Sequence, residues 1–313
     1  MAQVACVGIL VADVMARPVD KIPGKGLLEQ VSSIEMYTGG NAMTATVNLQ
    51  TLGTQSAIVG KVGADVFGDF LEKEFQKRGI DTRGLVKDPN TQTSVSVVLS
   101  DRDGERSFLH CVGANGTFCL DDINWKVIEE AEIVFVTGSF LMNTFDGEQT
   151  RLFLKKCKEL GKTTLLDVCW DAKGQWGKVL DPCMPYIDIF MPSIDEAVQL
   201  TGEKEPPQIA DVFFAKGVGK VVIKWGKRGC YARESIDAEG VVLPTLEKMP
   251  VVDTTGAGDS FCSGFLAALA RGKSFLECCA FANATGSVSV SAKGATTAMR
   301  SYEEVEKIRK EYE

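Results

Sequence analysis

Short apolar runs alternate along this chain with segments whose apolar residues recur every three or four positions. The first pattern is typical of buried strands and the second of amphipathic helices. Strands are expected at residues 4–10, 57–59, 133–137, 164–168, 187–191 and 221–224, and helices at 42–52, 66–78, 148–160, 194–200, 260–270, 275–289 and 302–310. Because strands that alternate with helices form parallel sheets covered on both faces, the sequence predicts an α/β fold.

Two regions break this alternation. Residues 31–38 and 93–111 have the pattern of strands with no helix between them, and Asp101-Arg-Asp-Gly104 has the composition of a hairpin turn. Such strands need a partner outside the main sheet. We therefore predict a small sheet, from about residues 14–38 and 93–112, inserted in a single domain that spans 1–313. Both a lid over a ligand cleft and a dimerisation surface fit this arrangement.

Composition narrows the classes of partner. The chain has 313 residues, of which 45% are hydrophobic, and a formal net charge of −8. Such a protein is not expected to take nucleic acid or an anionic membrane as its main partner. No apolar run approaches the length of a membrane span, and the first residues lack the layout of a signal peptide. We expect a soluble, cytoplasmic protein.

Ten cysteines and one histidine limit the metal and hydrolase chemistry of the chain. No Cys-x-x-Cys occurs, and most thiols lie in apolar runs, as expected of reduced core residues. Because His110 is the only histidine, triads and metal sites built on histidine are hard to assemble.

The stretch Asp253-Thr-Thr-Gly-Ala-Gly-Asp259 comes directly before a predicted helix. Its glycines let successive backbone N–H groups point into one space, and the helix start adds unpaired N–H groups, so the stretch suits a phosphate. A carboxylate beside such a site makes sense if Asp259 takes a proton from a nucleophile that attacks phosphorus. The alternative is a glycine-rich turn with Asp259 as a helix-start residue.

A second polar group stands near the start of the chain. Gly39-Gly40-Asn41 precedes the first predicted helix, and Asp13 follows the first predicted strand, at the sheet edge where ligands bind. The Asn41 amide can donate to and accept from a hydroxyl, although it also suits a helix N-cap. Two phosphate motifs are absent from the sequence: Gly161-Lys-Thr163 lacks the earlier glycine of a P-loop, and residues 7–13 lack the later glycines of a dinucleotide fingerprint.

Together these motifs resemble the two signatures of the ribokinase-like (PfkB) carbohydrate kinases. The early signature matches residues 39–53 and 60–68, and the late one matches 253–259 with Phe261 and Gly264. The resemblance covers nearly the whole chain. It implies a ribokinase-like three-layer α/β fold with a mostly parallel central sheet and a small β lid. It also implies an ATP-dependent kinase, similar to ribokinases, fructokinases and ketodeoxygluconate kinases, that phosphorylates a hydroxyl of a small carbohydrate.

The resemblance also implies roles for individual residues. Asp259 would be the general base, beside an anion hole formed by Gly256, Ala257 and Gly258. The sugar would be held by Asp13, Gly39, Gly40 and Asn41, with Arg106 of the lid reaching it. ATP would lie along Lys224, Gly226, Thr255 and Asn283. Mg²⁺ would be contacted through water by Glu196. A homodimer through the lid is a further expectation from the family.

Three features depart from the family pattern or stay open. Ser193 replaces the asparagine that often precedes the family's glutamate, and Asp171 stands where many relatives carry an arginine near the phosphates. A monovalent cation, K⁺, is a further expectation around Asp253, Thr255 and the loop 293–295.

Other functions compete with a sugar kinase. A nucleoside kinase is an alternative within the superfamily, and a sugar-binding regulatory pseudokinase is an alternative outside catalysis. The intact Gly-Ala-Gly and the retained Asp259 argue against the pseudokinase. A nicotinamide oxidoreductase is disfavoured by the missing fingerprint. The sequence does not predict which sugar is bound.

Overall fold

Nine strands form one central sheet within residues 2–102, 105–246 and 249–312, the parts of the chain that the computed structural model describes. Their order is β13-β12-β11-β10-β9-β8-β1-β4-β5, parallel from β11 to β5, with antiparallel pairings at the β12 and β13 edge. The strands are β1 (Val4–Gly8), β4 (Ser56–Gly63), β5 (Asp81–Asp88), β8 (Ile133–Ser139), β9 (Thr163–Val168), β10 (Ile189–Phe190), β11 (Lys220–Lys224), β12 (Cys230–Arg233) and β13 (Val241–Leu243). The predicted α/β fold with a mostly parallel sheet is confirmed.

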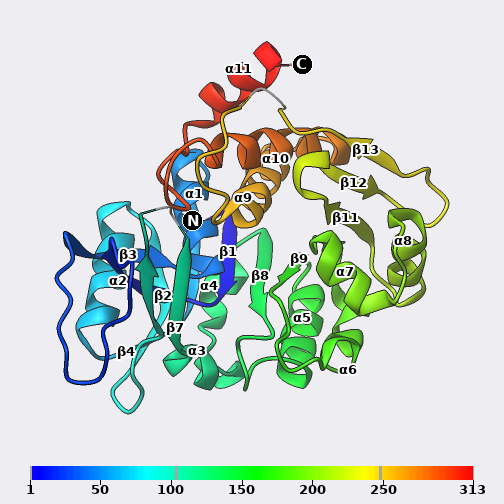
Figure 1. The fold of residues 1–313 in the computed structure, drawn as a ribbon. Coiled ribbons are helices and arrows are strands. Elements are labelled where there is room, and N and C mark those ends of the chain that lie inside the picture. Colours follow the sequence, from blue (N-terminus) through cyan, green and yellow to red (C-terminus); the bar gives the residue numbers. More distant parts are fainter. Residues whose placement is uncertain (1, 103–104, 247–248, 313) are drawn as a thin grey trace.

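Helices cover both faces of this sheet (Figure 1). They are α1 (Asn41–Thr51), α2 (Val66–Lys77), α3 (Gly113–Thr117), α4 (Trp125–Glu130), α5 (Glu148–Glu159), α6 (Trp176–Leu180), α7 (Ile194–Thr201), α8 (Pro206–Ala215), α9 (Ala257–Leu269), α10 (Phe275–Ser289) and α11 (Tyr302–Tyr312). None of the helices in the described residues is both long and apolar enough to cross a membrane.

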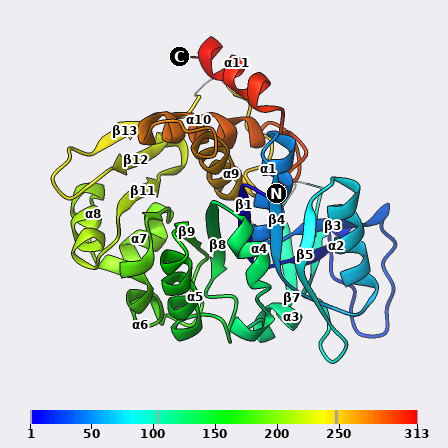
Figure 2. The same ribbon diagram turned by 180° about the vertical axis from the view of Figure 1, so that it is seen from behind.

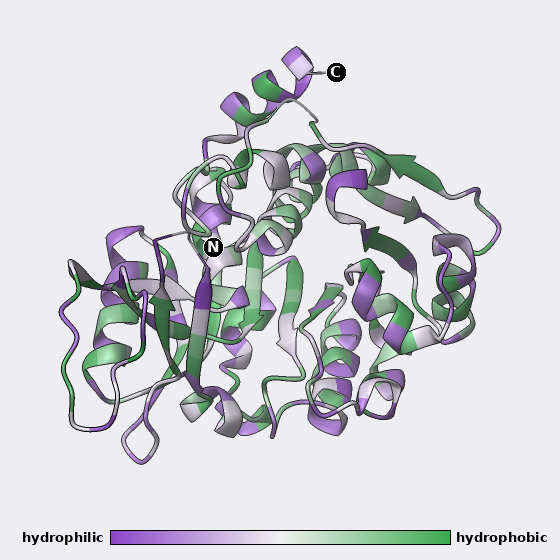
Figure 3. Cartoon of the chain, viewed as in Figure 1, coloured by the Kyte–Doolittle hydropathy of each residue, from purple (hydrophilic) through white to green (hydrophobic). Residues whose placement is uncertain are grey.

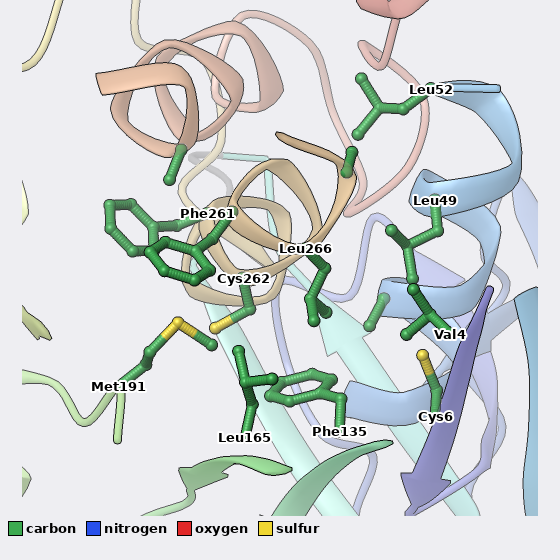
Figure 4. Close-up of a cluster of buried hydrophobic side chains, with 14 of the residues drawn as sticks. Val4, Cys6, Leu49, Leu52, Phe135, Leu165, Met191, Phe261, Cys262 and Leu266 are labelled. Atoms are coloured by element: carbon green, nitrogen blue, oxygen red, sulfur yellow. The ribbon is translucent and has the colours of Figure 1, made fainter. Parts of the chain in front are cut away.

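The two faces of the sheet bury separate hydrophobic clusters. Along β1, Val4 and Cys6 belong to the cluster beneath α1, α2, α9 and α10, whereas Ala5 and Val7 belong to the cluster beneath α4, α5, α7 and α8. This split follows from the strand geometry, in which successive side chains point to opposite faces. Figure 4 shows part of the first cluster, where residues of α9 such as Leu266 lie over the strands. In Figure 3 the central strands are mostly hydrophobic, as expected of a sheet covered on both sides.

A second, four-stranded sheet lies beside the β5 end of the central sheet, next to α2 (Figure 2). It is built from β2 (Val11–Arg17), β3 (Ser33–Gly39), β6 (Val95–Ser100) and β7 (Arg106–Cys111), in the order β3-β2-β6-β7. We call it the small sheet. Strands β6 and β7 pair antiparallel, as the predicted hairpin requires. Asp103 and Gly104 of the predicted turn lie outside the described residues.

The predicted elements are present with different ends. The first apolar run was expected to form one strand to residue 10, but β1 ends at Gly8 and β2 begins at Val11. The side chain of Asn115 causes this break, because it accepts from the backbone N–H of Leu10 (3.0 Å) and donates to its carbonyl (2.9 Å). The late helix starts at Ala257, three residues before the predicted start, so Asp259 lies in its first turn.

Candidate active site

The two signature motifs meet at one carboxylate. The Asn41 amide donates a 2.7 Å hydrogen bond to Oδ1 of Asp259, although the two residues are 218 positions apart. Asn41 is the first residue of α1, and about two turns further along α1 the amide of Asn48 ties this helix to α9 by donating to the Ser260 hydroxyl (3.0 Å). The starts of both helices therefore lie at the same place.

Neighbouring groups fix the orientation of the Asn41 amide. The Cys169 thiol donates to its oxygen (3.2 Å), which leaves the amide nitrogen facing Asp259. Gly40 precedes the helix with a φ of 89°, and a Cβ added there would lie 2.5 Å from the carbonyl oxygen of Ile9. Only glycine fits this close backbone approach without strain.

Residues 256–258 form the start of α9 and are a candidate phosphate cradle. Gly256 has a left-handed φ of 71°, and a Cβ added there would lie 2.4 Å from the Cβ of Ala295. The first backbone N–H groups of a helix lack partners within the helix and carry its positive dipole end. An anionic group is therefore favoured in front of residues 256–258.

A buried ion pair supplies a full positive charge to this cradle. Lys224, the last residue of β11, pairs with Asp167 of β9 at 2.7 Å, and their side chains are 13% and 2% exposed. A Cβ added to Gly258 would lie 3.4 Å from the Lys224 ammonium, so that ammonium lies against the cradle. Burial alone would lower the pKa of Lys224, but Asp167, Cys262 and Glu196 outweigh it and raise that pKa. Lys224 is therefore cationic.

The same surroundings favour the charged form of Lys224 but disfavour the charged form of the candidate base, Asp259. Burial, together with the negative charge of Asp167, raises the pKa of Asp259 to about 7, against the lowering effects of the Asn41 hydrogen bond and of Lys224. A carboxylate with a pKa near neutrality is well matched to accept a proton under physiological conditions.

A cavity of about 500 Å³ borders Asp259. Its lining includes the predicted sugar-binding residues Asp13, Gly39, Gly40 and Asn41, and it also includes Arg106 of the small sheet. Burial raises the pKa of Asp13 to about 6, while a hydrogen bond from Ser96 lowers it. The Ser96 hydroxyl also lies 3.1 Å from Nδ1 of His110, so Ser96 links His110 to Asp13, the member of this group that lines the cavity.

Arg106 points at the loop before the cradle. It donates to Asp253 (2.6 Å) and to the hydroxyl of Thr255 (2.7 Å). Its predicted role was to reach the substrate; in the structure it lines the cavity and its guanidinium is paired with Asp253.

The residues predicted to hold ATP occupy different positions. Lys224 lies at the cradle, and Gly226 follows it in a turn, with a φ of 54°. Asn283 of α10 is only 4% exposed, and its amide donates to the carbonyl of Leu243 (2.9 Å). This hydrogen bond holds β13 against α10 and leaves Asn283 little surface for a ligand.

Glu196 is the residue expected to contact magnesium through water. In the described part of the chain, no group of three His, Cys, Asp or Glu side chains is placed to hold a metal. Glu196 accepts from the backbone N–H of Ser193 (2.8 Å), and Ser193 caps α7, so the two residues form a capping box. Burial raises the pKa of Glu196, and Lys224 opposes this. The carboxylate of Glu196 is therefore close enough to Lys224 for the two charges to interact.

Asp171 has a structural role. It is 5% exposed, and its carboxylate accepts from the backbone N–H groups of Lys173 (2.9 Å), Gln175 and Trp176 (2.7 Å). It therefore orders the turn before α6.

Sequence reasoning did not assign site roles to Asp167, Ser96 and Cys169. Asp167 follows four apolar or β-branched residues near the carboxyl end of a parallel strand, which is the signal that singled out Asp13. Ser96 and Cys169 carry no comparable signal, because their importance depends on which strands and helices come together.

Comparisons with known proteins show which family the chain belongs to. The family model of the pfkB family carbohydrate kinases matches residues 1–301. A fructokinase of Vibrio alginolyticus is 28% identical over 292 residues, covering 90% of this chain and 92% of the relative. The 2-dehydro-3-deoxygluconokinase of Bacillus subtilis is 28% identical over 282 residues, covering 86% and 85%.

Solved structures lead to the same family. A ribokinase of Arabidopsis thaliana, complexed with ribose and ATP, superposes with a TM-score of 0.85 at 26% identity and covers 99% of both chains. The chain thus belongs to the pfkB family of carbohydrate kinases and is an ATP-dependent sugar kinase.

Proposed function

We propose that this sugar kinase uses Asp259 to deprotonate an acceptor hydroxyl held by Asp13 and Asn41, while residues 256–258 and Lys224 hold the transferring phosphoryl group. The observation that carries the proposal is the hydrogen bond from Asn41 to Asp259 (2.7 Å), because one carboxylate then borders both the cavity and the cradle. Phosphoryl transfer needs alignment and charge stabilisation more than covalent chemistry, and this arrangement supplies both.

Each part of the phosphoryl transfer can be assigned to a residue of the site. The acceptor hydroxyl lies in the cavity against Asp259, which takes its proton as the oxygen attacks the γ-phosphorus of ATP. The bond from this phosphorus to the bridging oxygen breaks, and ADP leaves with that oxygen. The N–H groups at the start of α9 and the ammonium of Lys224 stabilise the charge on the phosphoryl oxygens. We also propose Mg²⁺ as a cofactor, contacted through water by Glu196; when bound, it neutralises part of the phosphate charge.

One observation favours a riboside as the acceptor. Met15, Val98 and Phe108 are neighbours on three adjacent strands of the small sheet and line the cavity. Such an apolar wall suits a flat substituent on the sugar, as in a nucleoside. A nucleoside kinase therefore stays the second candidate function.

An acceptor panel tests the proposal. Ketoses, aldoses, sugar acids and ribonucleosides are incubated with ATP and Mg²⁺, and ADP release is measured. At least one sugar is expected to raise ADP release well above the acceptor-free rate. Turnover with nucleosides alone would support the second candidate, and sugar binding without any turnover would indicate a regulatory protein.

The rate should depend on pH through Asp259. Its folded-state pKa of about 7 lies above the ordinary carboxyl range, and only the ionised form accepts a proton. We therefore expect kcat/KM for the acceptor to rise as pH increases from 5.5 to about 7 and to level off above it. A profile that is flat over this range would contradict the assignment of Asp259 as the base.

We also propose that two copies of the chain pair through the small sheet. Met36, Val97 and Leu109 are 39%, 36% and 67% exposed and lie in one row across the sheet with Val14, on the face opposite Met15 and Phe108. Exposed apolar rows of this kind often mark protein interfaces.

Sedimentation velocity checks this pairing. The native chain is expected to sediment as a dimer and Leu109→Lys as a monomer. Leu152→Lys, at a 39% exposed leucine on α5, is the matched control and should stay dimeric. A monomeric native chain would refute the proposal.

We propose the cytoplasm as the compartment of this kinase. All ten cysteines are free, and burial raises the pKa values of Cys6, Cys157 and Cys183 to about 12, which keeps these thiols unreactive. Free thiols are typical of proteins in a reducing compartment.

A further inference from the structure

The Asp253 carboxylate, where a monovalent cation was expected, already has a full set of donors. Its Oδ1 accepts from Arg106 (2.6 Å), from the backbone N–H of Thr255 (2.9 Å) and from the hydroxyl of Thr255 (2.7 Å). Its Oδ2 accepts from the backbone N–H of Gly294 (3.0 Å). The side chain is 8% exposed, so few further ligands can reach it.

The groups around this carboxylate are thus hydrogen-bond donors, whereas a cation needs oxygen atoms with free lone pairs. Burial works against its ionisation, but the hydrogen bonds from Gly294, Thr255 and Arg106 outweigh burial and hold the pKa of Asp253 well below its usual range. A cation at this place would have to displace the guanidinium or lie beside a second positive charge. The residues present do not fit a bound K⁺ ion together with Arg106.

The guanidinium reaches this loop from the small sheet. Arg106 is the first residue of β7, lies 147 positions from Asp253 in sequence, and uses a second nitrogen to donate to the Thr255 hydroxyl (2.7 Å). Thr255 directly precedes Gly256, the residue before α9. The ion pair therefore ties the small sheet to the segment that begins the phosphate cradle.

We infer that the guanidinium of Arg106 takes the place of a monovalent cation, so that this kinase works without K⁺. Its charge holds Asp253 and Thr255 in place, which in turn fixes the backbone of residues 256–258. Because Arg106 belongs to the small sheet, the backbone of the cradle is correctly positioned only when that sheet lies over the cavity. Arg106 is thus a positioning residue. The inference rests on the proposed kinase activity for its kinetic part.

The kinetic test compares chloride salts of K⁺, Na⁺ and tetramethylammonium at one ionic strength. The turnover of the native enzyme is expected to differ less than about twofold among these salts, because the positive charge at Asp253 belongs to the side chain of Arg106 and not to an exchangeable ion. Arg106→Ala should lose roughly a hundredfold in kcat, because misplacement of a catalytic segment by about 1 Å has effects of that size. Arg106→Lys keeps the charge but loses the second, fixed donor. Its kcat should therefore lie between those of the native enzyme and of Arg106→Ala.

Arg83→Ala is the matched control. Arg83 also forms ion pairs, with the carboxylates of Asp81 and Glu130, but it lies on β5. Its loss should leave kcat unchanged. Several-fold activation of the native enzyme by K⁺, or full activity of Arg106→Ala in tetramethylammonium, would overturn the inference.

Thermal unfolding gives a readout that does not need turnover. K⁺ and tetramethylammonium are expected to give the same Tm for the native chain. A higher Tm in K⁺ would reveal a bound cation and overturn the inference. If no acceptor yields ADP, the proposed function fails, while this comparison still decides whether a cation binds.

Discussion

Replacing Asp259 with asparagine is expected to lower kcat roughly a thousandfold or more, which is within the range that a general base contributes. Asparagine has nearly the same shape and still reaches Asn41, so the variant should bind the acceptor with similar affinity. Steady-state ADP release and calorimetric titration of the acceptor measure the two effects separately. Unchanged turnover would remove Asp259 from its role as the base.

Stability gives an internal control for this variant. The folded-state pKa of Asp259, about 7, is raised above its unfolded value, so its ionised form is disfavoured in the folded protein. The resulting loss of stability grows as pH rises from about 4 towards 7 and is fully present above 7. Asp259→Asn removes this charge and should therefore unfold at a higher temperature than the native chain at pH 8. Lost activity in a more stable protein excludes unfolding as the cause.

Replacing Lys224 with methionine is expected to affect stability and turnover together. It leaves Asp167, which is 2% exposed, as a buried charge without its 2.7 Å partner. Removing one member of a buried ion pair destabilises proteins by about 3 kcal/mol or more. Urea unfolding should show a loss of this size, and kcat should fall because the cradle loses its ammonium.

The double variant Lys224→Met, Asp167→Leu separates the two effects. Replacing a whole buried pair by apolar residues is often nearly neutral, so most of the stability should return. The activity should not return, because the ammonium is still missing. A double variant as unstable as Lys224→Met would mean that the pair does not act as a unit, and restored turnover would mean that Lys224 does not contact the phosphoryl group.

The sequence predicts the fold well where local patterns carry it. The apolar runs of β1, β8, β9 and β11 and the periodic segments of α2 and α5 are readable because each is buried on a sheet face or along one stripe. Strand β5 was not predicted because it is an edge strand whose only apolar side chains, Leu85 and Val86, stand side by side among polar and charged residues. The break between β1 and β2 cannot be predicted from the local sequence, because the residue that binds the backbone there, Asn115, lies 105 positions away from Leu10.

In the site, too, local motifs could be predicted from the sequence, and contacts between distant segments could not. Glycine spacing and terminal carboxylates point to residues 39–41 and 253–259, because those motifs are local. The pairing of Asp167 with Lys224 and of Arg106 with Asp253 depends on which strands and loops meet, and sequence separation hides both. Asn283 illustrates the reverse, since its resemblance to a ligand residue does not reveal that its amide binds the backbone of β13.

The γ-phosphoryl group is expected to pass from ATP to a sugar hydroxyl at Asp259. Phosphorus NMR of the native enzyme with ATP, Mg²⁺ and the best acceptor of the panel tests it most directly. We expect one phosphate monoester to form for each ADP, no ADP without acceptor, and neither product with Asp259→Asn. Inorganic phosphate released at the same rate with and without acceptor, or full product formation by Asp259→Asn, would contradict it.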